Sequence, residues 1–85
     1  MEQQSMSASL DHTASRYAVD VEELVKGRLN GRVRAFRIAV ESKGLVLSGW
    51  CLTFHAKQLA QHLVMEISSV RILVNDIDVV NGEER

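Results

Sequence analysis

The polar residues within "SSVRILVNDIDVV", residues 68–80, are the first candidates for chemistry, because Asn75, Asp76 and Asp78 interrupt an apolar run. Carboxylates can bind a metal ion or transfer protons in catalysis. The alternation of a β-strand, however, places Asp76 and Asp78 on one face and Asn75 on the other. Since a calcium site needs about six to eight oxygens, we expect a strand with one wet face, and an Asn75 that binds backbone groups on the core side.

A second candidate set is His55, His62 and Cys51, which could bind zinc or supply a nucleophile. The two histidines are seven residues apart, which is about 10.5 Å along a helix. Zinc bonds of about 2 Å cannot bridge that distance, so two exposed histidines are expected. Cys51 falls on the core side of a strand and is expected to be a buried apolar residue. We therefore predict no catalytic residue, no metal site and no cofactor.

Two stretches carry apolar residues at helical spacing. Asp20 and Glu23 form an Asp-x-x-Glu capping box that predicts a helix start at Asp20, while Tyr17 leaves an earlier start open. The Asn-Gly pair at 30–31 predicts the end of this helix. The second helix is predicted to follow Thr53, which can cap it. Its apolar stripe consists of Ala56, Leu59, Ala60, Leu63, Val64 and Ile67.

Three segments alternate between apolar and polar residues, as β-strands do. Residues 32–41 and 45–52 are joined by a short turn with Gly44, which predicts a β-hairpin, and a third strand follows from Val70. The predicted order is therefore α-β-β-α-β. The side expected to face the helices carries Phe36, Ile38, Val40, Leu45, Leu47, Leu73, Ile77 and Val79. The opposite side is expected to carry Ala35, Ala39, Val46, Trp50, Ile72 and Val74.

The chain has 85 residues and a net charge of −1, which predicts one small domain without an overall attraction to nucleic acid or acidic lipid. We expect a flexible tail over residues 1–15, a folded domain over residues 16–80 and a charged end over residues 81–85. The sequence shows no secretory signal and no apolar run long enough to span a membrane. A cytoplasmic location is expected, or a periplasmic one if a leader has been removed.

Basic residues are concentrated in the middle of the chain, where Glu41 is the one acidic residue. They are Lys26, Arg28, Arg32, Arg34, Arg37 and Lys43. Such a cluster can contact lipid phosphates or nucleic acid. The alternative is a solvated helix end and edge strand, where charge prevents aggregation. Nucleic acid is less favoured, because no aromatic platform accompanies the basic residues.

The second side of the predicted sheet is a further candidate for binding. Trp50 stands there with Val46 and Val74 and two small alanines, which is typical of a contact patch. The alternative is that Trp50 lies flat on the sheet under the N-terminal tail.

Several motifs resemble those of one known family, with the same spacing. "VLSGW" and its hairpin resemble a V-x-L-x-G strand through Leu45, Leu47 and Gly49. "AQHLVMEISSV" resembles a helix that ends in Gly-Val, and "VRILVNDIDV" resembles V-x-x-V-x-N-x-L-x-V. The residues in register are Ala60, Val64, Ile67, Val70, Leu73, Asn75, Ile77 and Val79. Residues 20–80 are thus similar to a BON domain, the bacterial OsmY and nodulation domain.

The resemblance implies an α+β two-layer sandwich with two helices on one face of a three-stranded mixed sheet. It also implies a non-catalytic module that binds phospholipid surfaces or holds protein partners together. We expect a binding or scaffold module that contacts a protein partner, a second copy of itself as a homodimer, or a phospholipid surface. The alternative is a small nucleic-acid-binding regulator. The expected binding residues are Arg28, Arg32, Arg34, Arg37, Val46, Trp50 and Val74.

Overall fold

The computed structural model describes the backbone of residues 2–80 and the side chains of residues 16–80. Its elements are α1 (Glu2–Leu29), β1 (Val33–Glu41), β2 (Gly44–Cys51), α2 (Phe54–Ile67) and β3 (Ile72–Val79). The predicted order α-β-β-α-β is therefore confirmed. The charged end expected over residues 81–85 lies outside the described residues.

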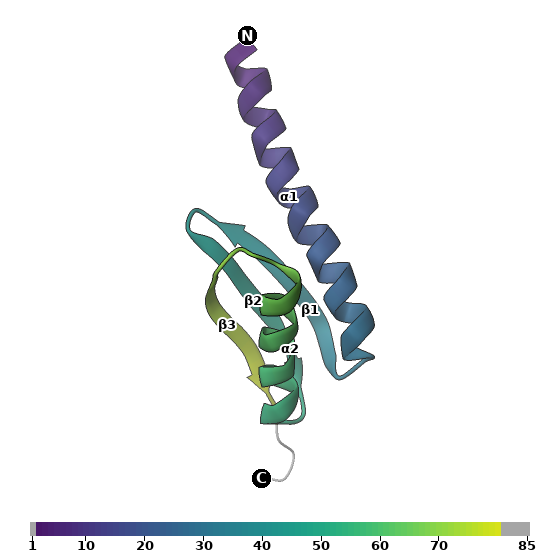
Figure 1. The fold of residues 1–85 in the computed structure, drawn as a ribbon. Coiled ribbons are helices and arrows are strands. Elements are labelled where there is room, and N and C mark those ends of the chain that lie inside the picture. Colours follow the sequence, from purple (N-terminus) through teal and green to yellow (C-terminus); the bar gives the residue numbers. More distant parts are fainter. Residues whose placement is uncertain (1, 81–85) are drawn as a thin grey trace.

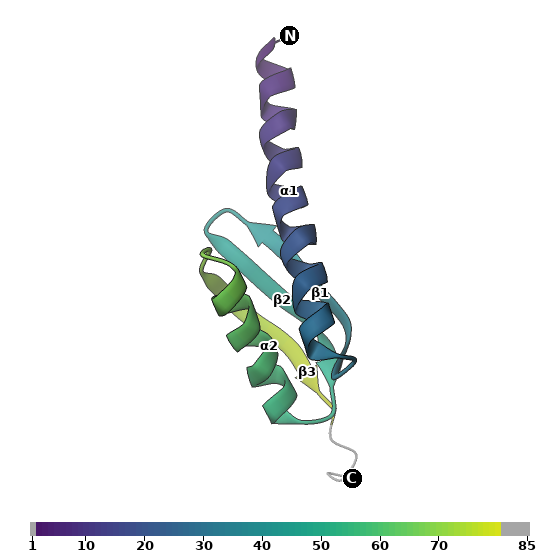
Figure 2. The same cartoon turned by 45° about the vertical axis from the view of Figure 1, so that its right-hand side comes forward.

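The three strands form one mixed sheet in the order β1-β2-β3. β1 and β2 pair antiparallel, as the predicted hairpin, whereas β2 and β3 run parallel. Parallel neighbours need a crossover connection, and α2 provides it. Both helices lie on one face of the sheet, α1 against β1 and α2 across β2 and β3 (Figures 1 and 2). The predicted α+β two-layer architecture is confirmed, and the other face of the sheet carries no described helix.

The first helix starts earlier than the capping box indicates. α1 begins at Glu2, so Asp20 and Glu23 lie inside it and the prediction of a start at Asp20 is wrong. The sequence before Gly27 contains neither glycine nor proline, so no strong helix breaker separates the two parts. The N-terminal turns extend beyond the sheet (Figure 1). The flexibility expected of residues 1–15 stays a prediction.

The other helix ends follow their sequence signals. After Leu29 the chain enters the left-handed region, with φ of 54° at Asn30 and 84° at Gly31, which terminates α1 as predicted. At the start of α2, the Thr53 hydroxyl accepts a hydrogen bond of 3.0 Å from the Ala56 N–H, so the predicted cap is confirmed.

The core lies between the two helices and the covered face of the sheet. Cys51 is fully buried within it, as predicted. The buried side chains of the core are Ala18, Val21, Val25, Leu29, Val33, Phe36, Ile38, Leu45, Leu47, Cys51, Ala56, Ala60, Leu63, Val64 and Ile77. This core ties every described element to the others, and Val79 packs at its border.

A β-bulge interrupts the alternation of β1. Arg34 pairs with Trp50 and Arg37 with Ser48, so β1 carries one more residue than β2 over this stretch. The extra residue places Ala35 in the left-handed region with φ of 54°, instead of on the far side of the sheet. Beyond the bulge, Val40 was expected in the core but is 42% exposed, because it borders a surface hollow between α1 and the hairpin end of β1.

A second register shift changes the first residues of β3. Leu45 pairs with Ile72 but Val46 pairs with Val74, so one residue of β3 is skipped. Ile72 consequently packs against the core, although it was expected on the opposite face. Leu73 was expected in the core but is 38% exposed, with its Cγ 2.9 Å from the point where a Cβ on Gly44 would lie. Both expectations are wrong because an uninterrupted alternation was assumed.

On each edge strand of the sheet, one backbone N–H donates a hydrogen bond to a side-chain oxygen. On β1, the Ile38 N–H donates to a carboxylate oxygen of Glu22 at 2.9 Å, and Glu22 also pairs with Lys26 at 3.4 Å. On β3, the Ile77 N–H donates to Asn75 Oδ1 at 3.2 Å. Each helix thus lies close to one edge: α1 through Glu22 and α2 through the Asn75 amide.

Candidate functional site

We call the sheet face that no described helix covers the open face. It is built from cross-strand rows, because directly paired residues point to the same side of a sheet. Its residues are Arg34, Arg37, Ala39 and Glu41 from β1, Val46, Ser48 and Trp50 from β2, and Arg71, Leu73, Val74, Asp76 and Asp78 from β3 and the loop before it.

The first row of the open face joins Arg34, Trp50 and Asp78, since Trp50 pairs with both of its neighbours. The Arg34 guanidinium carbon lies 5.8 Å from the centre of the Trp50 ring. This is within the range of a cation–π interaction, which holds the indole and the guanidinium together. Trp50 nevertheless remains 41% exposed, so a large aromatic surface is available near the end of the central strand.

The next rows change from charged to apolar. Ser48 stands between Arg37 and Asp76 in the second row. The third row is Ala39, Val46 and Val74, with Val74 49% exposed. Leu73 adds a further half-exposed side chain beside this row. The open face therefore combines a Trp at one end with an aliphatic patch toward the other.

Charge is distributed across the open face in a simple pattern. On the β1 side stand Arg34 and Arg37, and on the β3 side stand Asp78 and Asp76. At the hairpin end the signs are reversed. Glu41 stands on the β1 side, where it pairs with Gly44. Arg71 stands on the β3 side, and its Cγ lies 3.0 Å from the point where a Cβ on Gly44 would lie. The face thus carries equal numbers of positive and negative side chains. The ion pairs found among the described residues, Lys26–Glu22 and His62–Glu66, involve none of them.

The structure brings together most, but not all, of the predicted binding residues. Arg34, Arg37, Val46, Trp50 and Val74 share the open face. Of the two remaining residues, Arg32 lies at the border of this face and Arg28 lies elsewhere. Arg28 is in the last turn of α1 on the helix side of the sheet, and Arg32 lies in the loop before β1. The basic segment is therefore divided between two sides of the molecule.

Arg32 borders a hollow at one end of the open face, together with Arg34 and Trp50. The hollow has a volume of about 370 Å³ and reaches Thr53 and His55 at the start of α2. The Thr53 hydroxyl is already engaged in capping α2. The hollow extends the contact surface around Trp50 toward α2.

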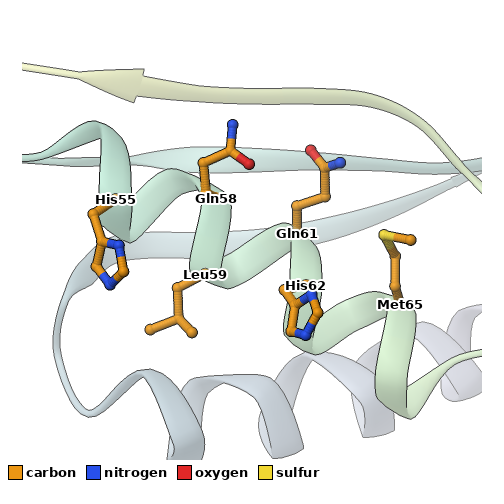
Figure 3. Close-up of a pocket in the computed structure, with 6 residues that line it drawn as sticks. All are labelled: His55, Gln58, Leu59, Gln61, His62 and Met65. Atoms are coloured by element: carbon orange, nitrogen blue, oxygen red, sulfur yellow. The ribbon is translucent and has the colours of Figure 1, made fainter.

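The histidines expected to be exposed lie on the outer side of α2. His55, Leu59 and His62 point to one side of the helix, whereas Gln58 and Gln61 point toward β3 (Figure 3). The shallow hollow that they line has a volume of about 310 Å³. His62 Nε2 lies 3.3 Å from a Glu66 carboxylate oxygen. Among the described residues, no group of three or more His, Cys, Asp or Glu side chains could hold a metal ion.

Asn75 has a structural environment of the kind expected of it. Its amide nitrogen donates to the Lys57 carbonyl at 3.1 Å and to Gln61 Oε1 at 3.2 Å. Its oxygen accepts from Ile77 N–H. Asn75 thus fastens β3 to α2, and Asp76 and Asp78 are exposed on the other face, as the alternation predicted.

The charged partners on the open face were not predicted from the sequence. Asp76 and Asp78 were assigned to one side of a strand and the arginines to another strand, without a pairing between them. The pairing of β2 with both neighbours aligns Arg34 with Asp78 in one row. A signal existed, because Trp50, Arg34 and Asp78 each lie at the same end of their strands in the predicted hairpin and closing strand.

No family model, curated protein or solved structure matches this chain. In the described part of the chain, neither helix is long and apolar enough to cross a membrane. The function must therefore be inferred from the residues of the open face.

Proposed function

We propose that this domain is a non-catalytic binding module that contacts a protein surface through its open face. The observation that carries the proposal is the exposure of Trp50 on the central strand of a sheet face that no described helix covers. Trp residues in such positions are enriched among those that dominate binding energy. Leu73 and Val74 enlarge the apolar area, while the charged residues on both sides form a polar rim.

The charge pattern supports a protein partner over a phosphate-bearing one. A membrane surface or a nucleic acid presents negative charge, which would attract Arg34 and Arg37 but repel Asp76 and Asp78 in the same rows. A protein surface can supply both signs in a fixed arrangement. The nucleic-acid alternative used the four arginines from Arg28 to Arg37 as one cluster. They do not share one surface, because Arg28 lies on α1, so the proposal does not include nucleic acid.

We also propose that the domain is BON-like. The element order α-β-β-α-β and the two helices on one sheet face are what that resemblance implies. A module that holds protein partners together is among the functions the resemblance suggests. It agrees with the proposal made from the open face alone.

Site-specific photocrosslinking tests the function. A photoreactive amino acid replaces Ser48, which stands at the centre of the open face, and a matched variant carries it at Gln58, which is exposed on α2. We expect the chain to crosslink to a bound protein from position 48 and to none from position 58. Crosslinking from position 58 alone would overturn the proposal.

Vesicle flotation separates a lipid surface from a protein partner. The chain is incubated with vesicles of anionic phospholipid at low ionic strength, and Trp50 fluorescence is followed at the same time, since it is the one tryptophan of the chain. We expect no flotation and no change in emission, because Asp76 and Asp78 oppose the approach of phosphate. If the chain floats with the vesicles and Trp50→Ala does not, the open face binds a lipid surface and not a protein partner.

A further inference from the structure

The open face has a charge pattern that is complementary to itself. Across the sheet, from the β1 side to the β3 side, the first row reads Arg34, Trp50, Asp78 and the second reads Arg37, Ser48, Asp76. The two sides therefore carry opposite charge in the same rows. No ion pair satisfies these four side chains within the described residues.

A two-fold axis parallel to β2 makes use of this pattern. If two sheets pack face to face about such an axis, each row meets the same row of the second copy in reversed order, because the rotation exchanges the two sides of the sheet. Arg34 then lies across from Asp78 of the second copy, and Arg37 from its Asp76. Because β2 is the central strand, Trp50 meets Trp50 and Val46 meets Val46. Facing sheets pack about 10 Å apart in nearly aligned orientation, a distance that such side chains fill.

The reversed charges at the hairpin end obey the same rotation. Glu41 on the β1 side would face Arg71 of the second copy on its β3 side. A two-fold axis perpendicular to the strands would reverse the order of the rows. Arg34 would then face Glu41 and Asp78 would face Arg71, but Arg37 and Asp76 would face the uncharged Ala39 and Val74. Only the axis parallel to β2 matches every charged residue of the face with one of opposite sign.

We infer that the occupant of the open face is a second copy of this chain, docked about a two-fold axis parallel to β2. This inference rests on the proposed function, because it uses the same face and names its partner. A two-fold contact is closed and uses one patch twice, as most homodimers do. Each copy places its Arg34 and Arg37 against carboxylates that have no ion-pair partner within their own described chain.

The size of the face sets the strength of the contact. β2 has eight residues, and a sheet of its length and three strands measures about 26 Å by 14 Å. Two such faces bury less than the roughly 1,200 Å² at the lower end of stable protein–protein interfaces. The dimer is therefore expected to be weak and reversible.

Charge reversal at one row tests the geometry. Sedimentation of the full chain over a range of concentrations measures the dimer, and the emission of Trp50 follows its burial. In Arg34→Asp and in Asp78→Arg, both copies of the row carry like charges in the dimer, so each variant alone should lose at least about tenfold in affinity. An equimolar mixture of the two variants restores both opposite-charge pairs, and dimers should return within about threefold of the original affinity. The matched controls Arg28→Asp and Asp20→Arg make the same charge changes on α1 and should dimerise as the original chain does.

Three outcomes would overturn the inference. The first is a chain that stays monomeric up to the millimolar range. The second is a mixture of Arg34→Asp and Asp78→Arg that stays monomeric although the original chain dimerises. The third is equal loss in the α1 controls, which would assign the effect to overall charge. If the chain is monomeric while position 48 still crosslinks to a different protein, the homodimer fails and the proposed binding function stands. If dimers form with emission from Trp50 unchanged and no crosslink from position 48, both fail.

Discussion

Gly49 lies against the backbone of Ala35 at the β-bulge of β1. A Cβ on Gly49 would come within 3.2 Å of the Ala35 carbonyl oxygen and within 2.8 Å of the Arg34 carbonyl oxygen. Gly49 also has φ of 139°, which side-chain-bearing residues rarely adopt. The bulge and the glycine thus depend on each other, and together they set the position of Arg34 beside Trp50.

Gly49→Ala is expected to destabilise the domain by at least about 2 kcal/mol, because it adds both a close contact and an unfavourable backbone conformation. Urea unfolding followed by circular dichroism measures the change. Gly27→Ala is the control, since a Cβ there meets nothing within 4 Å and lies within α1. A Gly49→Ala variant as stable as the original chain would contradict the close approach of β1 and β2 at the bulge.

Ala35 should tolerate glycine better than a branched side chain. Its φ of 54° costs an alanine about 1 kcal/mol, which glycine avoids while losing a similar amount of entropy. Ala35→Gly is therefore expected to be as stable as the original or up to about 1 kcal/mol more stable. Ala35→Val should be less stable by about 2 kcal/mol, because a β-branched residue fits this region poorly. If Ala35→Val had a higher unfolding free energy than Ala35→Gly, the left-handed conformation of Ala35 would be excluded.

Asn75→Asp should weaken the attachment of β3 to α2. The substitution replaces the amide that donates to Lys57 and Gln61 with a second acceptor, while still accepting from Ile77. We expect a loss of about 1–3 kcal/mol in unfolding free energy at neutral pH. The reciprocal change on the next residue, Asp76→Asn, is a matched control on the exposed face and should stay within about 0.5 kcal/mol. Equal effects of the two variants would argue against the bond between Asn75 and α2.

Tyr17 should ionise at lower pH in the folded chain than a free tyrosine does. The hydrogen bond with Ser68, 2.9 Å between the hydroxyl oxygens, lowers the pKa of Tyr17, and Ser69 adds to the effect against an opposing contribution from burial. The Ser68 oxygen already accepts from the Val70 N–H, so its own proton is free to stabilise the phenolate. Since Tyr17 is the chain's one tyrosine, its ultraviolet absorbance reports this titration directly.

The lowered pKa of Tyr17 determines a sign for stability. The folded chain releases the phenol proton below the unfolded pKa of about 10, so the unfolding free energy rises as pH increases from the folded pKa to the unfolded one. This added stability is present above the unfolded pKa and is lost as pH falls through the folded pKa. The effect is small, because Tyr17 is 39% exposed. Ser68→Ala should move the titration back toward its value in denaturant. A titration unaffected by Ser68→Ala, in a variant whose circular dichroism is unchanged, would remove Ser68 as the cause.

Alternation and spacing predicted the parts of the fold where nothing interrupts the period. Cys51 and Asn75 lie on the side expected of them, because β2 and the later part of β3 alternate without a break. Val40 and Leu73 did not follow the prediction. Each lies beyond a register shift or at an uncovered end of a strand, and a bulge leaves no clear mark in a sequence read one strand at a time.

The open face was only partly predictable for the same reason. Trp50, Val46 and Val74 could be assigned to it from their own strands. Its opposed charges depend on which residue of β1 and which of β3 stand beside each residue of β2, and that is set by long-range pairing. Arg28 was included with the other arginines because it is close in sequence, but the end of α1 turns the chain away before β1 begins.

The occupied N–H groups of Ile38 and Ile77 have a consequence for how far such a molecule can assemble. With Glu22 bound to one border strand and Asn75 to the other, strand-by-strand polymerisation meets an obstacle on either side. If the open face binds a second copy, as proposed, the described residues leave one surface for assembly. Such a domain would form pairs, and its small sheet would not extend into a fibril.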